Sequence, residues 1–347
     1  MNNKLHILVT GGAGYIGSHT VVELILQGFR VSIVDNLNNS SIKVLDAIEK
    51  ITNTKPAFYN FDLCDDIAVN KFVSENNDIA AIIHFAAYKA VGESVEKPLM
   101  YYRNNINSLV NVLDNINEKT PINFKGIVFS SSCTVYGQPD ILPVTEQSEI
   151  KKAESPYGFT KQVCEEILVN NSANVNYVSI ALRYFNPIGA HSSALIGELP
   201  NGVPNNLVPY ITQTGIGKRE CLNVFGNDYN TPDGSCIRDF IHVVDLAKAH
   251  VASINRLIEN RNKSIFEVFN IGTGRGNTVL EVINSFEKVS ESKLNYKIVE
   301  RRKGDIEKIY ADTTYANNEL GWSAKSSLDD AMLSAWKWEL HLKNQNM

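Results

Sequence analysis

The stretch Gly11-Gly12-Ala13-Gly14-Tyr15-Ile16-Gly17 decides the fold, because it follows the apolar run Leu5–Val9 and opens a segment whose apolar residues recur at helical spacing. Glycines between a strand and a helix permit a tight turn and let backbone N–H groups approach a pyrophosphate at the positive end of the helix. A Gly-rich turn standing alone would look the same. In this context the stretch predicts a dinucleotide site, with contacts from Gly11, Gly14, Tyr15, Ile16 and Gly17.

Outward from this loop, the chain alternates apolar strand-like runs with longer helical patterns. That alternation predicts an α/β protein with a doubly wound parallel sheet (a Rossmann fold) and a smaller mixed α/β region that binds substrate. Ligands of such a sheet lie at the carboxyl ends of its strands. The expected strands are Lys4–Thr10, Arg30–Val34, Ile79–Phe85, Lys125–Ser131 and Tyr177–Arg183, and the expected helices are Tyr15–Gln27, Asn105–Lys119 and Tyr157–Asn171.

The pattern changes after Asn186, where loops rich in Gly, Pro and Asn appear at Gly197–Pro209 and Gly226–Gly234. We therefore expect residues 1–185 to form the dinucleotide-binding domain. Residues 186–347 should be mainly the substrate-binding region, with some segments returning to the first domain.

Composition excludes several classes of protein. The 347 residues are 44% hydrophobic and 20% charged, and the net charge of −5 leaves no basic stripe for a nucleic acid. No stretch approaches the roughly 20 apolar residues that span a bilayer, and Met1–Lys4 leads straight into a short apolar run without a signal peptide's features, so we expect a cytoplasmic protein. The five cysteines lack a Cys-x-x-Cys pair, which predicts reduced thiols and no metal site. They are Cys64, Cys133, Cys164, Cys221 and Cys236.

Two carboxylates follow the next strands. Asp35 ends the second strand, where a carboxylate accepts hydrogen bonds from both adenosine ribose hydroxyls and repels a 2′-phosphate, so the expected cofactor is NAD rather than NADP. A solvated Asp at a strand end is the alternative. Asp62 either caps a turn or meets the adenine.

Tyr157 and Lys161 stand four residues apart at the start of a helix, which Ser155 caps and Pro156 begins. This spacing places both side chains on one face. An ammonium near a phenol favours the phenolate, so we expect Lys161 to lower the pKa of Tyr157 from about 10 and make it a base near neutral pH. A Tyr-x-x-x-Lys pattern also occurs often by chance.

A hydroxyl upstream makes the pattern more specific. The strand Ile127–Phe129 runs into Ser130–Gly137 at the end of the sheet where ligands bind. A Ser hydroxyl there hydrogen-bonds the same substrate oxygen as the Tyr and helps to move its proton. Together with the Gly loop, this set of a Ser, Tyr157 and Lys161 is far more specific than the Tyr-x-x-x-Lys pattern alone.

With these motifs the chain resembles UDP-glucose 4-epimerases, in the extended short-chain dehydrogenase/reductase family, over essentially its whole length. The segments that carry the resemblance are Gly11–Ser18, Asp35–Leu37, His84–Ser94, Ser130–Gly137, Ser155–Gly158, Leu182–His191, Pro204–Leu207 and Arg238–Val243.

The resemblance implies a role for each matching residue. Ser132 and Tyr157 act on the 4-hydroxyl of the sugar, while Lys161 supports Tyr157 and the nicotinamide ribose. The implied NAD contacts are Asp35, Asn36, Asp62, Leu63, Phe85, Ala86, Ala87, Lys89, Asn104, Ser130 and Phe185, together with the Gly loop, Tyr157 and Lys161. The implied UDP-sugar contacts are Lys89, Ser132, Tyr157, Asn186, Asn206, Leu207, Phe225, Arg238, Arg302, Asp305 and Ile309.

Three of these positions can be weighed from the residues themselves. The guanidinium groups of Arg238 and Arg302 suit forked contacts with a diphosphate, although either could be a surface ion pair. Ile309 departs from the family, in which this position is Tyr in enzymes restricted to plain hexoses and Cys where a 2-acetamido group fits. A stiff, β-branched Ile predicts a pocket of intermediate width. The alternative is that Ile309 is a core residue and Tyr310 faces the sugar.

The activity implied is interconversion of UDP-galactose and UDP-glucose through a 4-keto sugar, by a homodimer packed through the helices beginning near Asn105 and Tyr157. A nucleotide-sugar dehydratase is a rival, but the Asp-Glu pair of such enzymes is replaced by Cys133 and Thr134. A sugar reductase or dehydrogenase would show net NADH turnover. A non-catalytic NAD-binding module would not need Ser132, Tyr157 and Lys161 together.

Overall fold

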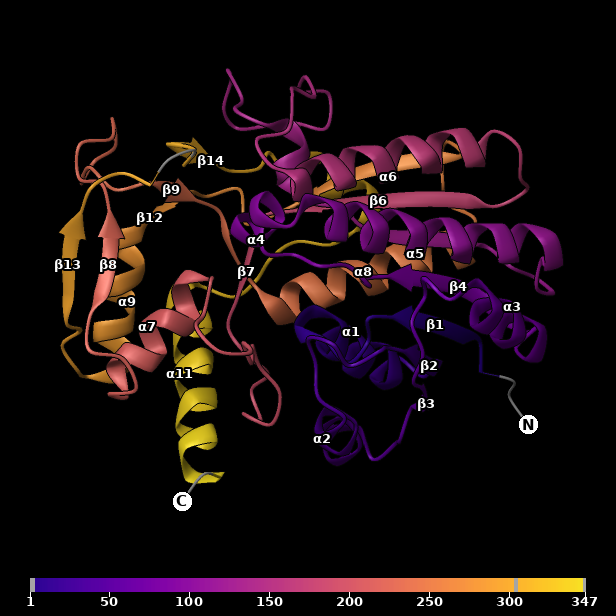
Figure 1. Ribbon diagram of the computed structural model, residues 1–347, viewed down its shortest axis with the longest axis horizontal. Coiled ribbons are helices and arrows are strands. Elements are labelled where there is room, and N and C mark those ends of the chain that lie inside the picture. Colours follow the sequence, from indigo (N-terminus) through magenta and orange to yellow (C-terminus); the bar gives the residue numbers. More distant parts are fainter. Residues whose placement is uncertain (1–3, 303–304, 346–347) are drawn as a thin grey trace.

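The computed structural model describes residues 4–302 and 305–345. Within these ranges, seven parallel strands form one sheet in the order β11-β6-β5-β4-β1-β2-β3 (Figure 1), which confirms the expected doubly wound fold. The sheet strands are β1 (His6–Thr10), β2 (Arg30–Val34), β3 (Ala57–Tyr59), β4 (Ile79–His84), β5 (Gly126–Ser130), β6 (Val178–Tyr184) and β11 (Phe266–Ile271).

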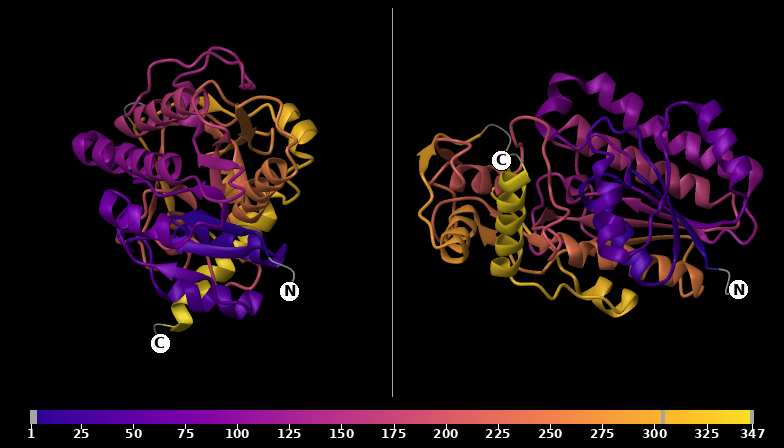
Figure 2. Two further views of the ribbon diagram at one scale, coloured as in Figure 1. Left: turned by 90° about the vertical axis from the view of Figure 1, so that its right-hand side faces the viewer. Right: turned by 90° about the horizontal axis from the view of Figure 1, so that it is seen from below.

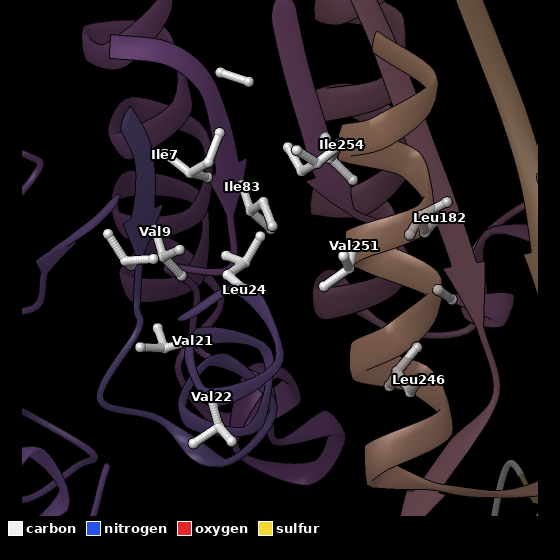
Figure 3. Close-up of a cluster of buried hydrophobic side chains, with 14 of the residues drawn as sticks. Ile7, Val9, Val21, Val22, Leu24, Ile83, Leu182, Leu246, Val251 and Ile254 are labelled. Atoms are coloured by element: carbon white, nitrogen blue, oxygen red, sulfur yellow. The ribbon is translucent and has the colours of Figure 1, made fainter. Parts of the chain in front are cut away.

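Helices cover both faces of the sheet. Alternate residues of each strand point to opposite sides, and because both sets are apolar, both faces must be buried. Ile7 and Val9 belong to one buried cluster and Leu8 to the other. Figure 3 shows the first cluster, in which sheet residues such as Ile83 face Val251 and Ile254 of a helix. The first face is covered by α1 (Tyr15–Leu26), α2 (Lys43–Thr52), α8 (Val243–Ile258) and α10 (Thr314–Leu320), and the second by α3 (Asp66–Glu75), α5 (Pro98–Lys119) and α6 (Pro156–Ser172).

The elements expected from the sequence lie within a residue or two of those observed, with one exception. The helix expected at Asn105–Lys119 begins at Pro98. Proline at the first helical position is compatible with a helix start, since its missing N–H would be unpaired there anyway. The aromatic and polar residues of the first two turns hid the helical period, so the sequence placed the start too late.

A second group of elements extends beyond one end of the sheet. Figure 2 shows that the last helix, α11, lies at this end, where it packs against α7 and α9. The residues here share a separate buried cluster that includes Ile211, Phe286 and Met332. The elements are β7 (Asn186–Ile188), α7 (Leu207–Gly215), β8 (Leu222–Phe225), β9 (Ile237–Arg238), β10 (Phe240–His242), β12 (Asn277–Thr278), α9 (Val279–Ser290), β13 (Tyr296–Val299), β14 (Lys308–Ile309) and α11 (Leu328–Gln345).

The chain beyond residue 186 does not stay in this second group. Helix α8 and strand β11 return to the sheet, where β11 pairs with β6 in parallel and forms its edge. Two short elements, α4 (Val91–Glu96) and the 3-10 helix η1 (Cys133–Tyr136), lie beside α6. In the part of the chain that the structure describes, no helix is long and apolar enough to cross a membrane.

Candidate active site

The glycine loop joins β1 to α1 in a conformation that leaves no room for side chains. Gly11 has φ +68°, and its N–H donates to the carbonyl oxygen of Val34 over 2.8 Å. A Cβ at Gly11 would lie 2.8 Å from the backbone nitrogen of Ala86, and one at Gly17 would collide with the carbonyl oxygen of Gly11. This cradle, which a Cβ would fill, fits close approach of a pyrophosphate to backbone.

The start of α1 is equally open to an anion. Gly14 is the N-cap and brings no side chain to the helix start, so the backbone there can face a ligand. Tyr15, the first helical residue, donates from its hydroxyl to the carbonyl oxygen of Gly189 over 2.6 Å. Ile16 packs against the first core cluster. The loop is thus attached both to the sheet and to the second group of elements.

Asp35 holds the glycine loop to the end of β2. Its carboxylate accepts hydrogen bonds from the N–H of Ala13 (3.1 Å), the N–H of Leu37 (2.9 Å) and the hydroxyl of Ser40 (2.9 Å). The half-buried carboxylate is therefore an organised part of the loop, not a solvated strand end. Its position at the carboxyl end of β2 is the one expected for a ribose contact.

Asn36 and Asp62 lie together beyond β2 and β3. The side-chain amide of Asn36 donates to Asp62 over 3.0 Å, and Asp62 also accepts from the N–H of Cys64 over 2.8 Å. Asp62 thus closes a turn in this structure, and its contact with adenine stays a prediction. The next residue, Leu63, is buried in the second core cluster.

The segment after β4 brings further expected contacts to the same edge. The N–H of Phe85 donates to the carbonyl oxygen of Thr10 over 3.0 Å, and Ala86 packs against the second core cluster. Ala87 is half-buried and Lys89 is exposed. Asn104, on α5, donates to the neighbouring Asn105 over 3.0 Å. Asn105 also bonds both backbone groups of Tyr88, an anchoring role that the sequence analysis missed.

The expected catalytic residues come from β5 and α6. Ser132 follows β5 and is the N-cap of η1, where its Oγ accepts from the N–H of Thr134 over 3.2 Å. Tyr157 is the second residue of α6, whose N-cap Ser155 accepts from the N–H of Gly158 over 3.1 Å, as the sequence predicted. Lys161 lies one turn further along α6 and is buried.

The Lys161 ammonium is held between the end of β5 and the ring of Tyr157. Its Nζ donates to the carbonyl oxygen of Ser130 over 2.6 Å and lies 5.8 Å from the centroid of the Tyr157 ring. Burial lowers the pKa of Lys161 to about 8, although the carboxylate of Glu165 acts in the opposite direction. At neutral pH, below this pKa, most of the lysine therefore keeps its proton and its positive charge.

The pKa of Tyr157 differs from the value expected from the sequence. Burial raises the pKa of its phenol well above the ordinary value of 10.0, and the neighbouring Tyr184 acts in the same direction. A hydrogen bond with Ser132 acts the other way but is the smaller effect. The expectation that Lys161 lowers this pKa is therefore not met in the protein without its ligands, because the cost of desolvating a phenolate is the largest effect.

A buried polar network lies next to the catalytic residues, and the sequence analysis did not predict it. The hydroxyl of Ser131 donates to Glu165, whose carboxylate pairs with the guanidinium of Arg183 over 2.5 Å. Arg183 also donates to the Tyr136 hydroxyl over 3.1 Å, and that hydroxyl donates to Asn270 over 2.6 Å. One signal was present in the sequence, since Glu165 follows Lys161 by four residues on the same helix.

The expected sugar-nucleotide residues gather on the second group of elements. Asp305 accepts from Arg302 over 2.7 Å and from Arg238 over 3.4 Å, so both guanidinium groups share one carboxylate oxygen. The Arg302 guanidinium lies 5.6 Å from the centroid of the Phe225 ring. Both arginines are thus ion-paired in this structure, with Arg302 60% and Arg238 17% exposed, and their contacts with a diphosphate stay a prediction.

Other residues link this group to the catalytic one. Arg238 lies close enough to Cys133, the residue after Ser132, to affect the pKa of its thiol. The N–H of Asn186 donates over 2.9 Å to the carbonyl oxygen of Asp239, next to Arg238. Asn206 is the N-cap of α7 and Leu207 its first residue.

The position expected to gate the sugar pocket lies in the core of the protein. Ile309 is 2% exposed, stands in register with Arg238 across β14 and β9, and packs in a cluster with Val135 and Phe185. The ring of Tyr310 lies against Gly276, where a Cβ would be 3.2 Å from its Cδ1. The gating role of Ile309 therefore stays a prediction.

A dinucleotide cradle, a Ser–Tyr–Lys set at the carboxyl end of β5 and an arginine-rich group facing it define an enzyme of the extended short-chain dehydrogenase/reductase class. A family model described as GDP-mannose 4,6 dehydratase matches residues 8–334. The UDP-glucose 4-epimerase of Dictyostelium discoideum is 49% identical over 96% of this chain and 95% of its own length. That of Bacillus subtilis is 49% identical, with 96% of each chain covered.

Solved structures agree with these relatives. UDP-glucose 4-epimerase from Bifidobacterium longum, in complex with NAD+ and UDP, superposes with a TM-score of 0.92 at 44% identity, covering 98% of this chain and 99% of its own. The enzyme from Stenotrophomonas maltophila, with bound NAD and formylated UDP-arabinopyranose, gives a TM-score of 0.94 at 44% identity, with the same coverage. The chain belongs to the UDP-glucose 4-epimerase family.

Proposed function

We propose that this protein is an isomerase that interconverts UDP-galactose and UDP-glucose by inverting carbon 4, with NAD as a tightly bound cofactor. The observation that carries the proposal is the meeting of Ser132, Tyr157 and Lys161 at the carboxyl end of β5, beside a loop shaped for a dinucleotide. Relatives of known structure bind NAD and UDP or a UDP-sugar, which supports the same ligands here.

Each catalytic residue has a distinct part in this reaction. In the ligand-bound enzyme, where the positive charges of Lys161 and of the nicotinamide favour the phenolate, Tyr157 accepts the proton of the 4-hydroxyl group and later returns it, while Ser132 hydrogen-bonds the same oxygen. Lys161 is held by the carbonyl oxygen of Ser130 and supplies positive charge beneath the phenol. NAD, which the glycine loop and Asp35 would hold, would supply reversible hydride transfer at carbon 4.

The arginine-rich group suits the part of the substrate that stays fixed. Arg238 and Arg302 share the carboxylate of Asp305, and a diphosphate offers both guanidinium groups a stronger forked acceptor. Phe225 lies beside Arg302 with its ring 40% exposed and available to a uracil face. Anchoring the nucleotide here lets the keto-sugar turn over between the two hydride transfers.

The dehydratase rival is weakened by one observation. A dehydratase needs an acid and a base to remove water, and Cys133 and Thr134 stand where such a pair would be. Desolvation raises the pKa of the Cys133 thiol to about 12, so this group neither gives nor takes protons readily at neutral pH.

A coupled assay tests the proposal directly. Purified protein given UDP-galactose should form UDP-glucose without added NAD, because the cofactor stays bound and is regenerated within each turnover. Protein unfolded to release its cofactor should yield NAD or NADH. Formation of a dehydrated sugar, net NADH turnover or release of mainly NADP would each contradict the assignment.

We further propose a cytoplasmic homodimer that packs through α5 and α6. These helices lie side by side and carry the exposed apolar residues Leu99, Val110, Phe159 and Val169. All five cysteines are free thiols, which suits a reducing compartment. Size-exclusion chromatography with light scattering should give twice the mass of one 38.6 kDa chain. The single-chain mass would contradict the dimer.

A further inference from the structure

One carboxylate outside the residues assigned so far touches both halves of the site. Glu198 lies on the loop between β7 and α7, and its Oε1 accepts from the Lys89 ammonium over 2.9 Å and from the Asn206 side-chain amide over 2.6 Å. Lys89 follows β4 at the carboxyl edge of the sheet, and Asn206 begins α7 in the second group of elements. A single oxygen atom thus joins the cofactor side to the sugar side.

The side chain of Asn206 makes this contact in place of the usual N-cap hydrogen bond. Asparagine at an N-cap usually accepts a hydrogen bond from the first turn of its helix. Asn206 is the N-cap of α7, yet its side chain forms no cap hydrogen bond and donates to Glu198 instead. The orientation of its amide is therefore set by Glu198 and not by α7.

Lys89 is held from two directions. Its Nζ lies 5.8 Å from the centroid of the Tyr15 ring and pairs with Glu198. Tyr15 in turn donates to the carbonyl oxygen of Gly189. Without Glu198, the exposed Lys89 ammonium would keep only the weak attraction of an aromatic face.

The backbone of Glu198 is fixed by the last helix. The indole N–H of Trp338 donates to the carbonyl oxygen of Glu198 over 2.9 Å, and a Cβ at the preceding Gly197 would collide with the same indole. The Glu198 side chain is only 11% exposed, so its bonds to Lys89 and Asn206 compete little with water. The carboxylate is a rigid support for both donors.

We propose that Glu198 is a positioning residue that sets the orientations of Lys89 and Asn206 together and so couples binding of the cofactor to binding of the sugar nucleotide. This inference rests on the proposed function, in which these two side chains contact the ligands. Because binding free energies are reciprocal, a link through one carboxylate lets each ligand strengthen the other's site.

Steady-state kinetics on the holoenzyme test this role with three variants. Glu198→Ala removes both hydrogen bonds, and it should raise KM for UDP-galactose about five- to thirty-fold, with a smaller effect on kcat, since two positioned donors become free to turn. Glu198→Gln keeps an amide oxygen that accepts both bonds, so its KM should stay within about threefold of wild type. Glu220→Ala, which removes an exposed carboxylate before β8, is the matched control and should behave as wild type.

A double-mutant cycle separates positioning from general stability. If Glu198 acts partly through Asn206, Glu198→Ala should raise KM by a smaller factor in an Asn206→Ala background than in wild type, and the remaining effect is the part that acts through Lys89. An unchanged KM in Glu198→Ala, a Gln variant as impaired as the Ala variant, or additive effects in the cycle would overturn the inference. Should the Ala variant fail to fold, Glu198→Asp, which is one methylene shorter and cannot reach both donors, replaces it. A wild-type protein that interconverts neither sugar would instead overturn the proposed function.

Discussion

The phenol of Tyr157 is the group on which the proposed chemistry depends most directly. Tyr157→Phe removes one oxygen atom from a buried ring, so the fold and the bound cofactor should be retained. Activity should fall about 100- to 10,000-fold, the usual contribution of a positioned acid–base group. The measurement is kcat for UDP-galactose, with unchanged thermal unfolding as the control. Turnover near the wild-type value would remove Tyr157 from the mechanism.

Ile309 tests the width of the sugar pocket. Wild type should turn over UDP-galactose efficiently and UDP-N-acetylgalactosamine more weakly, because crowding one extra group against a stiff wall costs about 1–3 kcal/mol. Ile309→Cys should improve kcat/KM on the acetylated sugar, and Ile309→Tyr should reduce it. Ile309→Val, which removes one methyl group from the same cluster, controls for general effects of repacking.

The opposite result has a clear meaning at this position. Ile309 packs beside Val135 and Phe185 in a closed cluster. If the Cys variant gains nothing on the acetylated sugar and the Tyr variant loses nothing, Ile309 is only a core residue. The facing residue would then have to be sought elsewhere, beginning with Tyr310.

Helix α1 contains a glycine, Gly17, at a position where helix propensity alone would favour alanine. Alanine is favoured over glycine by about 1 kcal/mol inside a helix. At Gly17, however, a Cβ would collide with the carbonyl oxygen of Gly11, so Gly17→Ala must push the loop away from the helix. We expect a loss of about 1–3 kcal/mol in unfolding free energy together with loss of bound NAD.

Gly92 is the matched control for this substitution. It lies in α4, and a Cβ there would meet open space. Gly92→Ala should keep its cofactor and gain up to about 1 kcal/mol. Urea unfolding measures the stability of both variants, and ultraviolet absorbance, which distinguishes bound nucleotide from protein, measures the cofactor that each retains. Cofactor retained by Gly17→Ala would show that the loop tolerates displacement.

The whole molecule carries a pH dependence of stability in its buried histidines. Burial lowers the pKa of His19 and His84 to about 3 and that of His250 to about 4. In the unfolded chain these groups titrate near 6.5, so below that pH the unfolded state binds more protons than the folded state. Stability should therefore fall as pH decreases from 6.5, by about 1.4 kcal/mol per pH unit for each histidine.

Urea unfolding between roughly pH 5 and 6.5 checks this slope. The lower limit is about pH 5 because burial raises the pKa of Asp239 and Glu146. Below it, protonation of these carboxyl groups stabilises the folded state and would mask the effect of the histidines. His250→Phe keeps an aromatic ring next to Phe85, and it should reduce the slope of unfolding free energy against pH by about 1.4 kcal/mol per pH unit, the contribution of one proton. A free energy of unfolding that does not change across this window would contradict the assignment of buried, neutral histidines.

The sequence was most informative where a feature is local. The Gly11–Gly17 loop, the cap at Ser155 and the spacing of Tyr157 and Lys161 are all found where the sequence placed them. Each depends on neighbours within a few residues, and those neighbours are readable in the chain itself. The resemblance to a known family added the roles, which local pattern alone does not contain.

The tertiary structure decided what depends on burial and on distant partners. Tyr157 has a raised pKa because the whole surrounding fold excludes water from it, a property that no spacing of residues records. Glu198 meets Lys89 across 109 positions of sequence, and Glu165 meets Arg183 only because α6 packs on β6. Local sequence determined which chemical groups this protein brings to its site, whereas desolvation and long-range packing determined their charge states and orientations, because both are properties of the assembled fold.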